Sequence, residues 1–256
     1  MIRVDYHMHS HYSHDGVGST EEHVRRAEEV GLAEICFTEH LDFYPSEDGL
    51  SCQTIPSDRE IRRYLEEIEE VRQRTRIAVR AGLELDYKPE ADRWVRGLLQ
   101  GVSDREGALR YFQERGPEQG CLDYLEVVRR AVGTGLFDSL AHLDLMKRFR
   151  PQNGELMRNG ELRERIVAIL ELMAATGTGI EINSAGLIHD PREAYPSLEL
   201  LRLARERGVE VLTVGSDSHR PETVGRKLDA ALSLAREAGY THVYTFEQRI
   251  PTALAL

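Results

Sequence analysis

The chain has 256 residues, 41% hydrophobic and 30% charged, which is enough apolar material for a sizeable core and excludes a disordered or fibrous protein. Its formal charge of −11 disfavours extended contact with nucleic acid, and no apolar run approaches the roughly 18–20 residues that cross a bilayer. Three cysteines without close spacing predict neither a disulfide framework nor a thiolate zinc site. The amino terminus lacks the apolar core of a secretion signal, so we expect a cytoplasmic protein with one domain over residues 1–256.

Short β-branched runs alternate with amphipathic helical segments along the chain. Ser19 and Glu22 form a predicted capping box, and the helix that they open is expected to end at Gly31. Ser57 and Glu60 form a second predicted capping box. Later helices are predicted around residues 122–128, 162–173, 198–204 and 224–235. The predicted strands are Ile2–Tyr6, Glu34–Thr38, Ile77–Leu85, Asp138–Ala141, Gly179–Asn183, Val209–Val214 and His242–Phe246. This alternation predicts a parallel barrel or a doubly wound sheet.

One interval interrupts the alternation, between the strand that ends at Leu85 and the strand that begins at Asp138. The sequence predicts a helix over Glu90–Leu99, a link at Gly101–Ser103, and one or two further helices. A strand is expected between these helices, but a link of three residues is too short to supply one.

Ionisable side chains gather where the predicted strands end. The carboxyl ends of the strands in a parallel barrel open on one face, so these side chains are expected to meet at one mouth. His7 and His9 lie two residues apart and therefore point the same way, as two imidazole ligands of one cation would. Glu84 lies within an apolar strand, where burying a carboxylate is costly unless it is paired or bound to metal. The other candidates at strand ends are His40, Asp86, His142, Asp144, Asn183, Asp217 and His219.

Several of these residues also have an ordinary structural interpretation. Asp15, which precedes a glycine, is equally consistent with a turn aspartate, and His40 with a hydrogen-bonded loop histidine. Asp217 and His219 can also bond to one another instead of to a metal. If the residues do bind metal, the mixture of carboxylates and imidazoles favours Mn, Fe or Zn.

Six short motifs follow one another along the chain: Asp5–Ser10 (DYHMHS), Ser13–Gly16 (SHDG), Thr38–His40 (TEH), Gly82–Glu84 (GLE), His142–Asp144 (HLD) and Gly215–His219 (GSDSH). Together they resemble the polymerase and histidinol phosphatase (PHP) superfamily, over about residues 4–246. Within that superfamily the chain is most similar to the phosphatases of histidinol phosphate. This closer similarity rests on Ala141–Phe149 (AHLDLMKRF), Ile182–Leu187 (INSAGL) and Ser216–Gly225 (SDSHRPETVG).

The resemblance implies a distorted (β/α)7 barrel of the TIM type that holds two or three divalent metals. By this analogy one metal takes His7, His9, Glu84 and Asp217, and Glu84 bridges to a second metal that also takes His142. Asp15, His40 and His219 hold the third. The family's remaining ligand is a histidine on the fourth strand, and no histidine lies between His40 and His142. We therefore expect the fourth strand to be missing, with a weak second metal and low activity unless the barrel closes differently or a longer segment belongs at the link.

The activity that the resemblance implies is hydrolysis of L-histidinol phosphate to L-histidinol and phosphate, a step of histidine biosynthesis. Asp217 and His219 are the predicted catalytic residues, either of which would pass a proton to the leaving alkoxide. The predicted substrate-binding residues are Lys147, Arg148, Asn183 and Arg220. The expected partner is a small-molecule phosphate monoester, with no nucleic acid and no membrane.

Three other functions remain open on the sequence. One is a phosphoesterase of the same superfamily that acts on nucleotides or on DNA 3′ ends, which the charge of −11 disfavours. Another is a metal-binding barrel whose catalysis is weakened or lost. The last is a metal-dependent amidohydrolase, which shares the pair of histidines at the end of the first strand.

Overall fold

Two parallel sheets of three strands each form the centre of the molecule. The computed structural model describes residues 3–41, 43–46, 49–52, 58–85, 87, 114–148, 158–190 and 192–256. One sheet has the order β1-β2-β5 and the other β6-β7-β8. The strands are β1 (Val4–Asp5), β2 (Glu34–Leu41), β5 (Ala78–Leu85), β6 (Ser139–Leu140), β7 (Gly179–Asn183) and β8 (Leu212–Gly215).

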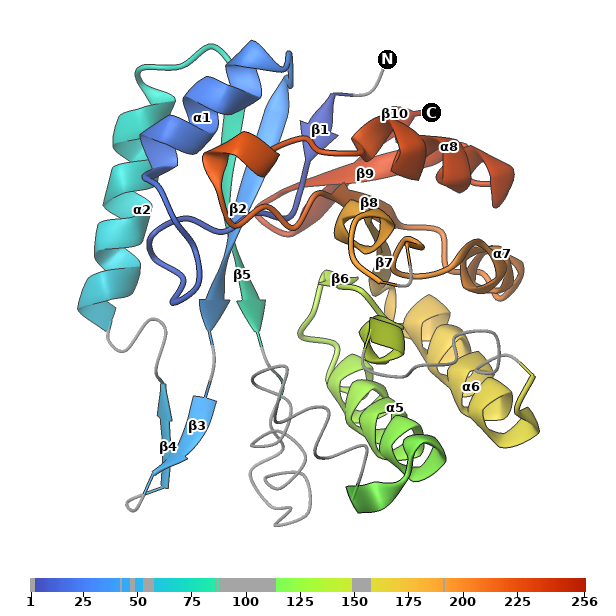
Figure 1. Ribbon diagram of the computed structural model, residues 1–256. Helices are drawn as coiled ribbons and strands as arrows, with labels where there is room; N and C mark the ends of the chain where they lie inside the picture. Colours follow the sequence, from blue (N-terminus) through green and yellow to red (C-terminus); the bar gives the residue numbers. More distant parts are fainter. Residues whose placement is uncertain are drawn as a thin grey trace.

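Strands β1 and β8 lie side by side and join the two sheets (Figure 1). The backbone N–H of Tyr6 donates to the carbonyl of Val214 at 2.9 Å, and Met8 forms a parallel bridge with Ser218. The described parallel strands therefore run in the spatial order β5, β2, β1, β8, β7, β6.

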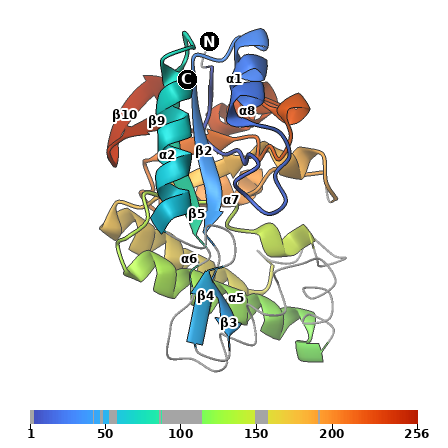
Figure 2. The same cartoon turned by 90° about the vertical axis from the view of Figure 1, so that its left-hand side faces the viewer.

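Helices pack on the outside of this row of strands. They are α1 (Thr20–Glu29), α2 (Asp58–Arg72), α5 (Pro117–Gly133), α6 (Gly160–Thr176), α7 (Leu198–Glu206) and α8 (Leu228–Glu237). Helices α1 and α2 lie beside β1, β2 and β5, whereas α5 to α8 accompany the second sheet (Figures 1 and 2). The described part of the second half also contains short 3-10 turns: η1 (Leu145–Arg148), η3 (Ser184–Leu187) and η4 (Pro221–Thr223).

The start of α1 confirms a prediction from local chemistry. The Ser19 side chain accepts from the Glu22 backbone N–H, and the Glu22 side chain binds back to the Ser19 backbone, so two amides that the helix itself leaves unpaired are bonded. Gly31 follows the helix with a φ of 77°, a conformation that glycine adopts at little cost.

Strands β7 and β8 of the second sheet are buried on both faces, whereas β6 is only partly buried. Ile182 and its neighbour Glu181 point to opposite faces of β7 and are both buried, as are Val214 and Thr213 of β8. Helices on the outside and the neighbouring strands remove both faces from water, which is the usual environment of parallel strands.

Each of the seven predicted strands has a counterpart in the structure, with shifted ends, but the seventh is paired antiparallel instead of parallel in the described part of the chain. Strand β9 (His242–Glu247) pairs antiparallel with β10 (Ile250–Ala255), a strand that was not predicted. The turn between them places Gln248 and Arg249 at φ values of 50° and 66°. Turns of this kind usually carry asparagine or glycine, so nothing in these residues indicated a hairpin. A second unpredicted hairpin joins β3 (Phe43–Ser46) to β4 (Gly49–Cys52).

Several predictions fall on residues that the structure does not describe. These are Ser57 of the second capping box, Asp86, the helix over Glu90–Leu99 and the link at Gly101–Ser103. The missing fourth strand therefore stays a prediction. Among the described residues, no helix is long and apolar enough to cross a membrane.

Candidate metal centre

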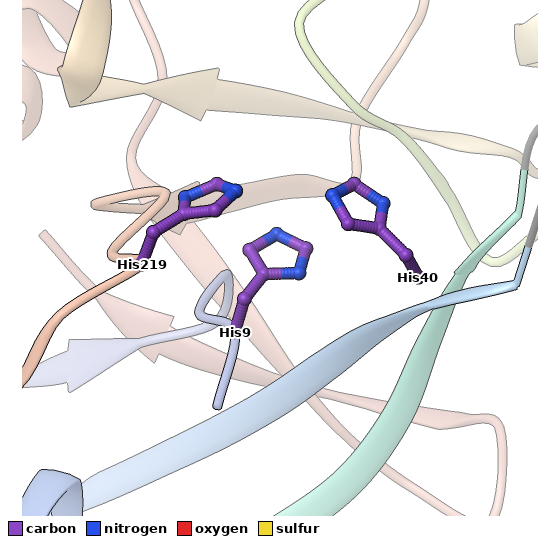
Figure 3. Close-up of side chains that lie close together, drawn as sticks. All are labelled: His9, His40 and His219. Atoms are coloured by element: carbon purple, nitrogen blue, oxygen red, sulfur yellow. The ribbon is translucent and has the colours of Figure 1, made fainter. Parts of the chain in front are cut away.

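The strand ends bring all eight predicted metal ligands into one cluster. His7 and His9 follow β1, His40 and Glu84 lie near the ends of β2 and β5, and His142 follows β6. Asp217 and His219 follow β8, and Asp15 comes from the loop after β1. The side chains of His9, His40 and His219 converge although they are far apart in the sequence (Figure 3).

The first group of donors fits a single metal ion. The Nε2 atoms of His7 and His9 are 3.1 Å apart, and Glu84 Oε2 lies 3.2 Å and 3.3 Å from them. Asp217 Oδ1 lies 3.6 Å from each of these nitrogens. Donors at about 2.0–2.1 Å from a tetrahedral zinc are about 3.3 Å from one another, so the spacing matches one coordination sphere.

Glu84 reaches a second position with its other oxygen. Glu84 Oε1 lies 2.7 Å from His142 Nε2, while Oε2 faces His7 and His9. Donor atoms of His7, Glu84 and His142 all lie within 4.8 Å of one another. A carboxylate whose two oxygens face different donors can bridge two cations, as the resemblance implies for Glu84.

A third group consists of His9, His40 and His219, whose donor atoms also lie within 4.8 Å of one another. The ring of His9 stacks on both of the others, with centroids 4.2 Å from His40 and 4.3 Å from His219. The carboxylate of Asp15 lies 3.5 Å from His40 Nε2 and 3.2 Å from His219 Nε2. The predicted ligands of the third metal are therefore adjacent.

Contacts outside the cluster leave the inward-facing nitrogens of two histidines available to metal. Glu181 Oε1 lies 2.6 Å from His7 Nδ1, so this nitrogen donates and His7 Nε2 is the one that offers its lone pair when the ring is neutral. The backbone carbonyl of Asp217 accepts from His219 Nδ1 at 3.0 Å and has the same effect. These tautomers, assigned from the hydrogen-bond partners, fit imidazole ligands of a divalent metal.

The electrostatic balance keeps the acids ionised. Burial raises the pKa of Glu84 and Asp217, but the neighbouring histidines, first of all His7, outweigh it and hold both pKa values well below their usual range. Burial lowers the pKa of His9 to about 4. Ionised carboxylates and a neutral imidazole are the protonation states that metal ligation requires.

Metal binding is expected to release protons, because three predicted ligands are protonated without metal. Burial lowers the pKa of His7, His142 and His219, but the carboxylates beside them outweigh it. The pKa of His7 lies well above its usual range, and the pKa values of His142 and His219 rise to about 9. A protonated imidazole cannot bind metal, so the apparent affinity for Zn²⁺ should rise as the pH increases from 6 to 9. Returning the same sample to pH 6 should lower the affinity again. Calorimetric titration in buffers of different ionisation enthalpy measures the protons released; an affinity independent of pH would contradict the assignment.

Two predicted substrate-binding residues serve a different purpose in the structure. Lys147 is 2% exposed, and its ammonium donates to Asp144 at 2.9 Å, to Glu193 at 3.1 Å and to the carbonyl of Ala194. An ammonium has three protons, so these bonds use all its donors. The prediction that Lys147 binds the substrate phosphate is corrected on this ground.

Asn183 requires the same correction. Its side chain is fully buried, and its amide nitrogen donates to Asp217 Oδ2 at 3.1 Å and to Glu181 Oε2 at 3.4 Å. The amide oxygen accepts from the backbone of Ala185 at 2.9 Å. Asn183 therefore orients Asp217 instead of presenting a free donor to a substrate.

Arg148 and Arg220 are exposed, as a role in substrate binding requires. Arg148 ends η1, the turn that follows His142. Burial and then the charge of Arg148 lower the pKa of His189, which also senses Asp217 and His219. His189 therefore lies within electrostatic range both of Arg148 and of two residues of the cluster, Asp217 and His219.

Sequence reasoning missed two buried carboxylates that support the cluster. Glu181, 3% exposed, binds His7 and also accepts from the backbone N–H of His142 at 3.1 Å. Asp5 is fully buried and accepts from the backbone N–H groups of Ser216 and Gly225 at 2.8 Å and 3.0 Å, which ties the loop that carries Asp217 to β1. The signal for Glu181 was present: like Glu84, it interrupts an apolar strand.

A row of parallel strands that collects imidazoles and carboxylates at its carboxyl edge defines an α/β protein with a candidate metal centre. The chain belongs to the PHP domain family, whose model matches residues 5–185.

Curated relatives match along almost the whole chain. The chain is 30% identical to a probable histidinol-phosphatase of Deinococcus radiodurans, over 96% of each protein. It is 28% identical to the histidinol-phosphatase of Lactococcus lactis, over 96% of this chain and 95% of that protein.

Solved structures match as well. A histidinol phosphate phosphatase of Lactococcus lactis, complexed with Zn, L-histidinol and phosphate, has a TM-score of 0.77 and 25% identity over 98% of both chains. A putative histidinol phosphatase of Listeria monocytogenes has the same fold, with a TM-score of 0.66 and 21% identity over 89% of this chain and 99% of the other.

Proposed function

We propose that this chain is a metal-dependent phosphomonoesterase that hydrolyses L-histidinol phosphate to L-histidinol and phosphate. The observation that carries the proposal is the cluster of eight side chains at the strand ends, in a chain similar over 98% of its length to a phosphatase complexed with zinc, L-histidinol and phosphate. The proposed cofactors are two or three divalent metals (Mn, Fe or Zn), held by the predicted ligands.

A distorted (β/α)7 barrel is the proposed architecture around this site. Glu84 of β5, at one end of the row of strands, lies 2.7 Å from His142, which follows β6 at the other end. This side-chain contact supports closure, since a barrel brings the first and last strands of a row side by side. A single domain, a cytoplasmic location and the lack of a nucleic-acid partner stay predictions.

Bound divalent metals would supply a nucleophilic oxygen at neutral pH and offset the negative charge of the phosphoryl group. Glu84 holds the two halves of the cluster together through its two oxygens. Asp217 stays ionised and is fixed by Asn183 at 3.1 Å, so it is suited to hold a divalent metal, and with so low a pKa it carries no proton for the leaving group at neutral pH.

The two roles predicted for His219 exclude each other at any one time. Its Nδ1 proton is bonded to the Asp217 carbonyl, so Nε2 either ligates a metal or carries the proton for the leaving alkoxide. If only the other ligands hold metal, His219 would be the proposed proton donor; in the metal-free protein its pKa of about 9 corresponds to a protonated ring at neutral pH. If a third metal binds, His219 would be one of its ligands. The number of metals per chain in the active enzyme decides between the roles.

Turnover of a substrate panel by the metal-loaded chain tests the proposed function. L-Histidinol phosphate should exceed an aryl phosphate and nucleoside monophosphates in kcat/KM by about 10²-fold, corresponding to about 2.7 kcal/mol of additional transition-state binding. Preference for a nucleotide, or hydrolysis of amides but not phosphates, would contradict the proposal.

Replacing Arg148 with alanine should raise KM for the phosphate monoester about 10- to 100-fold, because a hydrogen bond to a charged group contributes about 1.5–3 kcal/mol. Arg148→Lys should recover part of this loss, since lysine keeps the charge but not the two-pronged geometry. Arg202→Ala, which removes an exposed arginine paired with Glu237, is the matched control and should leave KM within about twofold. A KM unchanged in Arg148→Ala would remove this residue from the proposed phosphate site.

A further inference from the structure

Glu39 is a buried carboxylate to which the proposed reaction gives no role. It lies in β2 next to His40 and is fully buried. Its two oxygens accept from the Ser10 backbone N–H at 3.0 Å and 3.1 Å, from Ser10 Oγ at 2.6 Å and from Ser13 Oγ at 2.6 Å. Burial raises the pKa of Glu39, and the donors of Ser10 and Ser13 oppose that rise. A carboxylate is costly at this depth unless it is hydrogen-bonded, and these donors satisfy it.

Ser13 connects Glu39 to two predicted metal ligands. Its Oγ lies 3.2 Å from His9 Nδ1 and accepts from the His40 backbone N–H at 3.0 Å. A serine hydroxyl has one proton and two acceptor positions. An ionised Glu39 can only accept, so Ser13 gives its proton to Glu39 and must accept from both His40 and His9.

This arrangement fixes which nitrogen of His9 carries the proton. Nδ1 donates to Ser13, so Nε2 keeps its lone pair and faces His7 Nε2 at 3.1 Å and Glu84 Oε2 at 3.3 Å. We propose that Glu39 is a positioning residue, which acts through Ser13 to hold His9 in the tautomer that can bind metal. The inference rests on the proposed metal-dependent function, because His9 contributes to two of the three groups of donors.

The substitution Glu39→Gln is expected to reverse the chain of hydrogen bonds. The Ser10 backbone N–H can only donate, so the oxygen of the new amide should take the side of Ser10 and its NH₂ should face Ser13. Ser13 then accepts from this NH₂ and from His40, and its own proton turns toward His9. His9 must accept at Nδ1 and carry its proton on Nε2, toward the metal position.

Nitrogen-15 NMR of the histidine rings in the metal-free protein reads this tautomer without any catalysis. The wild-type protein should show His9 protonated on Nδ1, and Glu39→Gln should show it protonated on Nε2. Ser10→Ala is the matched control, because it removes a hydroxyl bonded to the same carboxylate but not to His9, and it should keep the wild-type tautomer. An unchanged His9 tautomer in Glu39→Gln would overturn the inference.

Metal affinity, measured by competition with a chelator, gives a second readout. Glu39→Gln should weaken Zn²⁺ binding about 10- to 100-fold, the range found when an outer hydrogen-bond partner of a ligand is lost. Ser13→Ala should have a smaller effect, because it leaves His9 free to adopt either tautomer. The double variant Glu39→Gln/Ser13→Ala should bind Zn²⁺ no more weakly than Glu39→Gln alone. Without the Ser13 hydroxyl, the new amide cannot turn a serine proton toward His9.

If Glu39 served only in packing, the isosteric Glu39→Gln should weaken Zn²⁺ binding less than Ser13→Ala does. That order of the two affinities would overturn the inference. These experiments test the role of Glu39 independently of whether the chain hydrolyses L-histidinol phosphate. A reversed tautomer with weakened Zn²⁺ binding supports the inference even in a chain that does not hydrolyse L-histidinol phosphate. Full turnover in a wild-type chain whose Glu39→Gln variant keeps the tautomer and the affinity rejects the inference alone.

Discussion

Replacing Glu84 with glutamine is expected to lower kcat/KM for L-histidinol phosphate by at least about 10³-fold, because charge stabilisation by a metal contributes several kcal/mol and about 4 kcal/mol corresponds to that factor. The carboxylate faces His7 and His9 with one oxygen and His142 with the other. An amide has the same shape but lacks the charge, and only one of its two ends can donate electrons to a cation.

Metal content and circular dichroism should be measured beside turnover for this variant. We expect fewer metals per chain and an unchanged helical signal, since Glu84→Gln keeps the volume of the side chain. Glu171→Gln, at an exposed glutamate of α6 paired with Arg207, is the matched control and should retain wild-type turnover. Wild-type metal content and turnover in Glu84→Gln would refute the bridging role.

Removing the metals should abolish turnover and lower the melting temperature by about 8–16 °C. A ligand at 1,000 times its Kd that binds only the folded state stabilises it by about 4 kcal/mol, and each kcal/mol shifts the melting temperature of a domain of this size by about 2–4 °C. Several strand ends and loops supply the predicted ligands, so a bound metal holds together segments that the unfolded chain keeps far apart.

Scanning calorimetry of the chelator-treated protein, before and after addition of Zn²⁺, measures this shift. The same titration on Glu84→Gln should give a much smaller shift, which separates binding at the cluster from binding elsewhere on the surface. Equal shifts in both proteins, or turnover that persists in the chelator, would contradict the proposed metal dependence.

The parallel strands and the cluster were predictable because each corresponds to a sequence pattern of a few neighbouring residues. A continuous apolar run predicts a strand buried on both faces, and a histidine or carboxylate just beyond it predicts a side chain at the carboxyl edge. The resemblance to the PHP superfamily then supplied the grouping of these side chains, which spacing along the chain does not contain. Glu84 and Asp217 both lie close to His7, in the grouping that this resemblance implied.

The supporting contacts were harder to predict, because they depend on partners that are remote in the sequence. From the sequence, Lys147 is a reasonable phosphate ligand, but in the fold its ammonium is bonded to Asp144 and Glu193. Asn183 likewise looks available until Asp217 comes beside it. Glu181 was within reach of sequence reasoning, since it interrupts an apolar strand just as Glu84 does. The hairpin of β9 and β10 was not, because its turn has residues that seldom adopt positive φ.

The scattering of the donors along the chain also constrains when a metal can first bind during synthesis. Each group of candidate donors combines histidines near the amino terminus with residues that are made much later. A growing chain that has passed Glu84 but not His142 holds His7, His9 and His40 without the partners that complete their spheres, and His219 is made after all the other donors. We therefore expect the complete groups to load with metal only after most of the protein is translated, and a nascent chain stalled earlier carries imidazoles that remain open to other transition metals such as copper or nickel.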